Sequence, residues 1–189
     1  MRNRLGLLGA ALIVALATPL PAAAQARVPD EGMWGLGFKS GVSMPFDDAL
    51  SPAFDMGVSL EGYVTPRVSI RGQLAGTWFD IKGRPFGGTV SPMAMTGNVV
   101  YNWELGKWHP FATGGLGVYR IRFDENDLDS SDTKLGVDFG GGLEYFFTRR
   151  DVLMGEATVH FIGDDRVDSA RSDYESRYWT ILGGYKRYF

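Results

Sequence analysis

Apolar and polar residues alternate along most of this chain with a period of two, the pattern of β-strands whose two faces meet different environments. Near the start, Trp34, Leu36 and Phe38 form one set, while glycines and Lys39 form the other. The same alternation predicts eight strands, over residues 33–43, 54–64, 68–80, 93–104, 110–123, 135–148, 152–162 and 176–189. The sequence therefore predicts an all-β fold.

The segments between these strands are alternately long and short. Thr65-Pro66-Arg67 is a turn marked by its proline. Short turns are also expected around Gly106 and at Arg149-Arg150-Asp151, and long loops at 44–53, 80–92, 124–134 and 163–175. Strands of about 9–11 residues are long enough to cross a membrane. The pattern predicts an eight-stranded antiparallel up-and-down transmembrane β-barrel, with its long loops outside the cell.

Alternation alone leaves open which face of the barrel points outward. A soluble, lipocalin-like barrel would place the apolar set inside, whereas a membrane barrel would place it in lipid. Aromatic residues near both ends of the strands, such as Trp34, Trp78 and Trp179, favour the membrane barrel. In lipid, an arginine such as Arg71 or Arg120 facing mid-bilayer would cost about 2–4 kcal/mol, so the charged set is expected to point inward.

This assignment predicts a polar network in the barrel interior. Its expected members are the charged residues and the histidine on the inward face: Glu61, Arg71, Glu104, Arg120, Arg122, Asp138, Glu144, Glu156, His160 and Lys186. Opposite charges are expected to pair, because an unpaired buried charge is costly. Two interpretations stay open, a plug that closes the barrel and a gated narrow path for water or ions.

The fifth strand is the least regular. Its alternation is clear only where Tyr119 and Ile121 oppose Arg120 and Arg122, and glycines between 114 and 117 leave room for a β-bulge. The face of this strand that points inward is therefore assigned from the energetic cost of placing an arginine side chain in lipid.

The first 24 residues have the features of a secretory signal peptide. Arg2 and Arg4 precede an apolar run over 5–17, and alanines at 22–24 form a cleavage site. The alternative, a membrane anchor, is disfavoured because the run is shorter than the roughly 20 residues that span a bilayer. We expect one β-barrel domain over residues 25–189.

Composition excludes several classes of function. The chain has no cysteine, which rules out disulfides and a thiol nucleophile. Its net charge of −3 becomes −5 without Arg2 and Arg4, opposite in sign to a nucleic-acid-binding patch. The 26 glycines are a high share for 189 residues and suit a β-barrel.

The final strand carries a family resemblance. With Gly184, Tyr185, Tyr188 and Phe189, it resembles the C-terminal assembly signal of bacterial outer-membrane β-barrels, although Arg187 stands where a second aromatic residue is usual. With Gly-aromatic segments such as 110–117 and 140–146, the chain from residue 25 resembles small barrels of the OmpA/OmpX type. The resemblance implies location in the outer membrane of a Gram-negative bacterium.

That resemblance also implies a function and partners. The expected function is non-enzymatic, supporting envelope integrity or surface interaction through the extracellular loops. The alternative is a narrow channel or an OmpW-like transporter of small or hydrophobic solutes. Expected partners are outer-membrane lipid, lipopolysaccharide and the barrel-assembly machinery, and the protein is expected to be a monomer that binds no nucleic acid.

No catalytic, cofactor or metal site is expected. Glu156 and His160 share a face but lie about 13 Å apart along one strand, too far for a proton relay. The sequence after His160 also lacks the His, Ser and Asn order of lipid A deacylases. The acidic run between Asp124 and Asp132 lacks the glycine and ligand order of an EF-hand loop.

Overall fold

The structure, a computed structural model, describes residues 29–46, 51–80, 89–125, 128–163 and 177–189. The expected signal peptide lies outside these residues. The described chain forms eight strands: β1 (Trp34–Pro45), β2 (Ala53–Thr65), β3 (Val68–Asp80), β4 (Thr89–Asn102), β5 (Trp108–Glu125), β6 (Leu128–Phe146), β7 (Asp151–Ile162) and β8 (Arg177–Tyr188).

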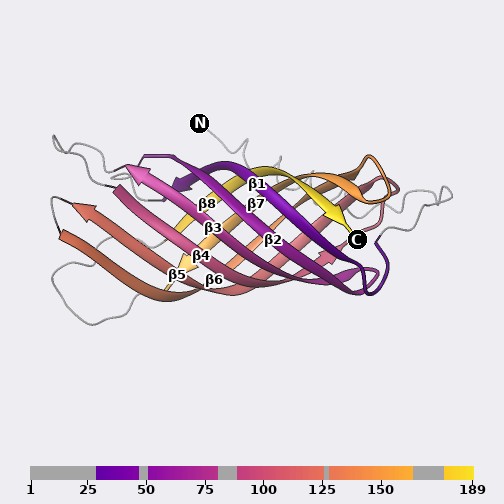
Figure 1. The fold of residues 1–189 in the computed structure, drawn as a ribbon, viewed down its shortest axis with the longest axis horizontal. Coiled ribbons are helices and arrows are strands. Elements are labelled where there is room, and N and C mark those ends of the chain that lie inside the picture. The colour runs from indigo at the N-terminus through magenta and orange to yellow at the C-terminus, as the bar shows by residue number, and fades with distance from the viewer. Residues whose placement is uncertain (1–28, 47–50, 81–88, 126–127, 164–176) are drawn as a thin grey trace, which may run out of the picture.

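Each strand pairs antiparallel with the next, and β8 returns to β1 to close the barrel. The expected eight-stranded up-and-down barrel is confirmed. Figure 1 shows the strands inclined to the long axis, with the short connections gathered at the end that carries the C-terminus. In the turn after β4, Gly106 adopts a positive φ of 71°, which favours glycine.

The β5–β6 hairpin is longer than the sequence pattern predicts. Its ladder continues to the pair Glu125 and Leu128, so the long loop expected at 124–134 is wrong. The side-chain alternation ends before the backbone pairing does. Hydrogen bonding between two strands needs no apolar side chains, so a polar hairpin can extend beyond the membrane.

The bulge considered for the fifth strand is absent. Strand β5 pairs with β4 from Asn102–Phe111 to Thr89–Asp124 and with β6 over its whole length, without a shift of register. Among the described strands, the register shifts instead at the end of β2, between Tyr63 and Thr65, beside the turn into β3.

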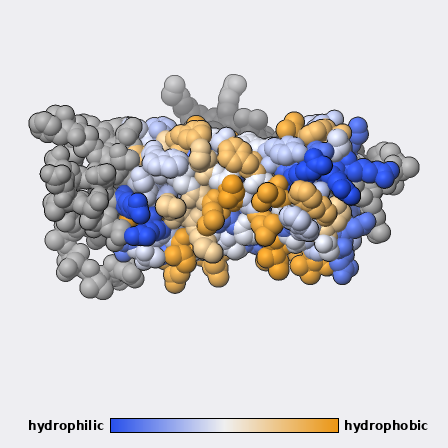
Figure 2. Space-filling model, viewed as in Figure 1, coloured by the Kyte–Doolittle hydropathy of each residue, from blue (hydrophilic) through white to orange (hydrophobic). Residues whose placement is uncertain are grey.

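Apolar side chains cover the outside of the barrel. On the face shown in Figure 2 they gather over the middle, with hydrophilic side chains nearer both ends. Leu116 and Leu135 are 70% and 74% exposed, whereas Glu61 and Arg71 on the inner face are fully buried. A soluble barrel would have the opposite arrangement, so the lipocalin-like alternative is wrong. The described residues include no helix that could cross a membrane, a finding that does not bear on strands.

Aromatic rings line the outer wall at the short-turn end. Trp34 stacks on Phe189 with ring centroids 4.4 Å apart, and Trp108 lies 4.6 Å from Tyr145. Trp103 packs edge-on against Tyr101. At the other end, Trp78 and Phe54 are exposed on neighbouring strands, while the side chain of Phe123 lies outside the described part. Amphipathic rings at these two levels suit the two interfaces of a bilayer.

Candidate functional site

The barrel interior is closed by apolar side chains at the short-turn end. Tyr63, Phe146, Val152 and Tyr188 form one buried cluster there. The rings of Phe146 and Tyr188 stack with centroids 5.8 Å apart, and Tyr63 meets Tyr188 edge-on at 5.7 Å. Because these side chains are at most 5% exposed, the cluster plugs this end of the barrel.

Arg71 lies at the centre of an ionic network above this plug. Its guanidinium donates from Nε to Glu61 at 2.7 Å and from Nη1 to Glu156 at 2.6 Å. Nη2 lies 3.7 Å from Glu144, and the ring of Phe111 packs 5.0 Å from the guanidinium carbon. One arginine from β3 thus joins carboxylates from β2, β6 and β7.

Lys186 of β8 makes a second bridge across the interior. Its ammonium contacts Glu61 and Glu144, both at 2.5 Å, and donates to the hydroxyl of Tyr188 at 3.1 Å. Glu61 also accepts from Ser69. The network therefore connects directly to the aromatic plug and ties β8 to β2 and β6, each two strands away around the barrel.

Lys39 is a third buried cation, which the sequence analysis did not include in the network. It contacts Glu156 and Gln73. The signal was present in the sequence, because Lys39 occupies the glycine-rich face of the first strand, opposite Phe38. Gln73 in turn donates to Asn98 at 3.0 Å, so the polar contacts continue across β3 and β4.

Two further carboxylates are held by neutral groups. Asp55 accepts from Ser43 at 2.9 Å and from Thr77, and Asp138 accepts from Asn98. Among the described residues, five buried carboxylates thus face three buried lysines and arginines: Asp55, Glu61, Asp138, Glu144 and Glu156 against Lys39, Arg71 and Lys186. Charge-assisted hydrogen bonds from hydroxyl and amide groups support the additional carboxylates.

A small cavity lies between the ionic network and the loop end. Its volume is about 20 Å³, room for about one water molecule. Lys39, Asp55 and Glu156 supply charged groups to its wall, and Ala75 and Ala94 leave the space open. A cavity of this size is no continuous pore.

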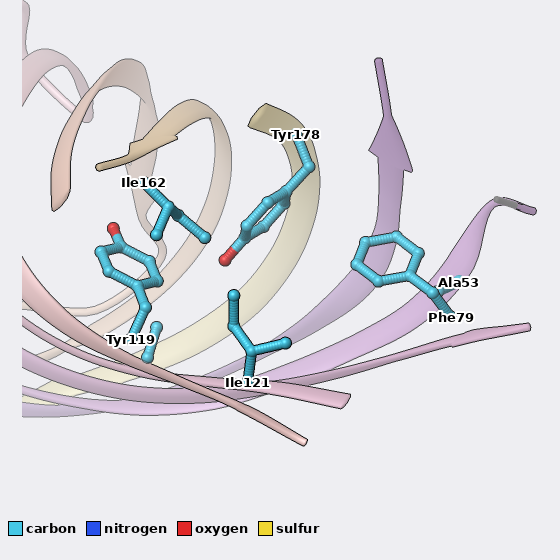
Figure 3. Close-up of a cluster of buried hydrophobic side chains, with 7 residues drawn as sticks. Ala53, Phe79, Tyr119, Ile121, Ile162 and Tyr178 are labelled. Atoms are coloured by element: carbon cyan, nitrogen blue, oxygen red, sulfur yellow. The ribbon is translucent and has the colours of Figure 1, made fainter. Parts of the chain in front are cut away.

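A second cluster closes the interior on the loop side of this cavity. Its side chains point inward from β2, β3, β4, β5, β7 and β8 (Figure 3): Ala53, Phe79, Ala94, Tyr119, Ile121, Ile162 and Tyr178. His160 lies between the ionic network and this second cluster. Its Nδ1 is 3.0 Å from the hydroxyl of Tyr119, and its ring stacks on Tyr178 at 4.5 Å. His160 thus serves as a packing and hydrogen-bonding group here.

The structure places most of the expected network on the inner face. The buried or nearly buried members are Glu61, Arg71, Asp138, Glu144, Glu156, His160 and Lys186. Glu104 follows the end of β4, in the turn, and is half-buried. Of the buried members, Asp138 and His160 make no ion pair among the described residues, and the other five are joined through Arg71 and Lys186.

Arg120 and Arg122 do not face the interior, and that expectation is wrong. Both are exposed, whereas Tyr119 and Ile121 are buried inside the barrel. The expectation assumed that these residues lie at bilayer depth. The hairpin instead extends beyond the apolar band, where an outward arginine costs only about 0–1 kcal/mol.

The residues of the expected assembly signal divide between the two faces. Tyr185 and Phe189 are exposed on the outer wall, whereas Tyr188 is buried in the plug. Gly184 faces inward, and a Cβ there would collide with the carbonyl oxygen of Phe38 on β1. Gly184 and Tyr188 therefore pack inside the barrel, and Phe189 stacks on Trp34.

The second histidine of the chain and the acidic run are separate from the network's centre. His109 is buried beside Phe146, and its Nε2 lies 3.1 Å from the carbonyl of Gly106. In the acidic run, Asp132 is exposed and lies 3.8 Å from Lys134; the side chains of Asp124, Glu125, Asp127 and Asp129 lie outside the described part. Across the described residues, no group of three histidine or acidic side chains could hold a metal ion.

Solved structures share this architecture at low sequence identity. Neisserial surface protein A aligns with a TM-score of 0.65 and 15% identity, over 84% of this chain and 98% of that one. The attachment invasion locus protein Ail of Yersinia pestis gives a TM-score of 0.59 at 14% identity, over 84% and 99%. The N-terminal β-barrel domain of Pseudomonas aeruginosa OprF gives 0.56 at 16% identity, over 85% and 100%.

Comparison at the level of sequence gives the family. No curated protein matches the chain. The sequence model of the outer membrane protein beta-barrel domain matches residues 9–186, nearly the whole chain. With the apolar outer wall, this match indicates the bacterial outer membrane and confirms the expected resemblance. The chain belongs to the outer membrane protein beta-barrel domain family.

Proposed function

We propose that this protein is a non-enzymatic, sealed outer-membrane barrel that acts at the cell surface through its long-loop end, in adhesion or in support of the envelope. The observation that carries the proposal is the filled interior. Aromatic clusters occupy both ends, and between them Arg71, Lys186 and Lys39 engage buried carboxylates. An eight-stranded barrel has just enough interior volume for such side chains.

The β5–β6 hairpin supports a role at the surface. The ladder continues from the apolar pair Val118 and Leu135 for seven further pairs to Glu125 and Leu128, so this hairpin extends past the last described pair of β6 with β7, Gly136 and Ile162. Ail, of similar fold, is named for attachment and invasion and has been crystallised with a heparin analogue. That likeness concerns the fold, and the surface role of this chain is our proposal.

A hairpin-shortening variant tests the proposal. Deleting the paired residues Phe123, Asp124, Asp129 and Ser130 removes two rungs of the β5–β6 ladder, together with the β4–β5 pairs of Phe123 and Asp124, and leaves the other pairs in register. Cells making the wild-type or shortened barrel would be compared for attachment to heparin-coated surfaces and for survival in bile salts, at equal amounts of heat-modifiable barrel. We expect the shortened barrel to lose at least one of these properties. Unchanged behaviour in both assays would contradict the proposal.

Conductance gives a second, independent test. Wild-type protein inserted in a planar lipid bilayer is expected to show no openings above background, because neither end of the interior is open. Regular single-channel steps from the folded, heat-modifiable form would overturn the sealed-barrel assignment and favour the gated path.

One observation favours a transport role as the second candidate. Pairing between β3 and β4 is missing at two positions, opposite Thr77 and Trp78, beside Pro92, which has no N–H to donate. Gln73, Ala75, Ala94 and Thr96 of the same two strands line the small cavity. A lateral path between cavity and lipid would pass through this seam. Faster uptake of a small hydrophobic solute by cells with the wild-type barrel than by cells with Pro92→Ala would favour this candidate.

A further inference from the structure

We propose that Arg120 and Arg122 form a docking site, on the outer wall of β5, for the phosphate groups of an outer-leaflet glycolipid, that is, for lipopolysaccharide. Both side chains are exposed, and as residues i and i+2 of one strand they share the lipid-facing side. Their Cα atoms are about 7 Å apart at the rise of a β-strand.

The two arginines begin where the apolar wall ends. Outward residues of β5 are apolar up to Val118, which pairs with the exposed Leu135 of β6. The next outward row pairs Arg120 with Thr133, and the row after it pairs Arg122 with Ser131. Acyl chains of a lipid in contact with Leu116 and Val118 would therefore bring its headgroup to the height of the arginines.

The described residues offer no partner to the charges of these two arginines. Arg71, Lys39 and Lys186 each contact at least one buried carboxylate. Within the described part of the chain, Arg120 and Arg122 make neither an ion pair nor a side-chain hydrogen bond, and the residues opposite them on β4 are Met93 and Ser91. Two guanidinium groups on a lipid-facing wall, with no anionic partner among the described residues, are available to an anion outside the chain.

The chemistry of arginine selects phosphate as that partner. A guanidinium presents a planar fork of donors that binds phosphate oxygens in pairs, and it is more weakly hydrated than an ammonium group. Lipopolysaccharide carries its phosphates at the junction of acyl chains and sugar. That junction meets the membrane surface at the level where the apolar band of β5 gives way to arginine.

Lipid retention by purified protein tests the proposal. The full chain, folded in detergent micelles, would be incubated with lipid A carrying two phosphates or with dephosphorylated lipid A, and the bound lipid counted by native mass spectrometry. The test variant is R120Q/R122Q. The matched control is R149Q/R150Q, which removes the same charge from exposed residues in the β6–β7 turn at the opposite end.

We expect wild type and control to retain phosphorylated lipid A at least about tenfold better than the dephosphorylated form, and the R120Q/R122Q variant to lose this preference. The heat-dependent gel shift verifies that each protein is folded. Three results would each overturn the site. The R120Q/R122Q variant could prefer phosphorylated lipid A as strongly as wild type does, or the R149Q/R150Q control could lose the preference to the same extent as R120Q/R122Q. Wild type could also retain the two forms of lipid A equally.

Discussion

Trp34 and Phe189 join the first strand to the end of the chain by both side chain and backbone. Their rings stack with centroids 4.4 Å apart, and the Phe189 amide donates to the carbonyl of Trp34 at 2.7 Å. The Trp34 amide returns a longer hydrogen bond of 3.4 Å to Phe189. This pair completes the seam between β1 and β8 at the short-turn end, so barrel closure involves the residue that the sequence resemblance assigns to assembly.

Phe189→Ala is expected to destabilise the seam. It removes an aromatic stack that contributes about 0.5–1.5 kcal/mol beyond simple burial, so the free energy of unfolding should fall by about that amount relative to a control. Phe161→Ala is the control, because Phe161 is similarly exposed on the outer wall and makes no ring contact among the described residues. Urea unfolding in phospholipid vesicles measures both. An equal fall in the free energy of unfolding in the two variants would mean that the Trp34–Phe189 stack does not stabilise the barrel.

Two adjacent glycines of β8 provide a matched test of close packing at the same seam. A Cβ at Gly184 would collide with the Phe38 carbonyl oxygen and come within 2.9 Å of Lys39 Cα, whereas at Gly183 the nearest atom lies 3.9 Å away. Gly184→Ala should therefore lower the free energy of unfolding by about 1–3 kcal/mol, while Gly183→Ala should change it little. The same vesicle assay compares them, and similar values for the two variants would contradict this packing.

Removal of Arg71 should be far more damaging than removal of a surface arginine. Arg71→Leu leaves Glu61, Glu144 and Glu156 with fewer positive partners in a buried site, and breaking a buried pair in this way costs about 3–5 kcal/mol. Arg67→Leu, in the exposed turn after β2, should stay within about 0.5 kcal/mol of wild type. A small effect of Arg71→Leu would show that water reaches the network freely.

The strands and the network were largely predictable because they depend on local alternation. A period of two assigns Glu61, Glu144 and Lys186 to one face without knowledge of their partners. The pairing itself was not predictable. Arg71 and Glu156 lie 85 positions apart, and contact between them depends on how eight strands are staggered around the barrel.

The error at Arg120 and Arg122 has a different origin. Alternation along β5 correctly separates these arginines from Tyr119 and Ile121, but it does not give the height of a residue in the membrane. The energetic argument for an inward arginine holds only within the apolar band. The β5–β6 ladder carries both arginines beyond that band. Its length is set by backbone pairing, which the pattern of apolar and polar side chains does not indicate.

Single cysteines test the phase and height of β5 directly, since the natural chain contains no cysteine. In intact cells, a membrane-impermeant maleimide is expected to label Arg120→Cys, which is outward and above the apolar band. It should not label Tyr119→Cys, inside the plug, or Leu116→Cys, in lipid. All three should react after unfolding in urea, which controls for protein amount. Labelling at 119 with protection at 120 would reverse the phase of β5, returning both arginines to the interior and removing the proposed phosphate site.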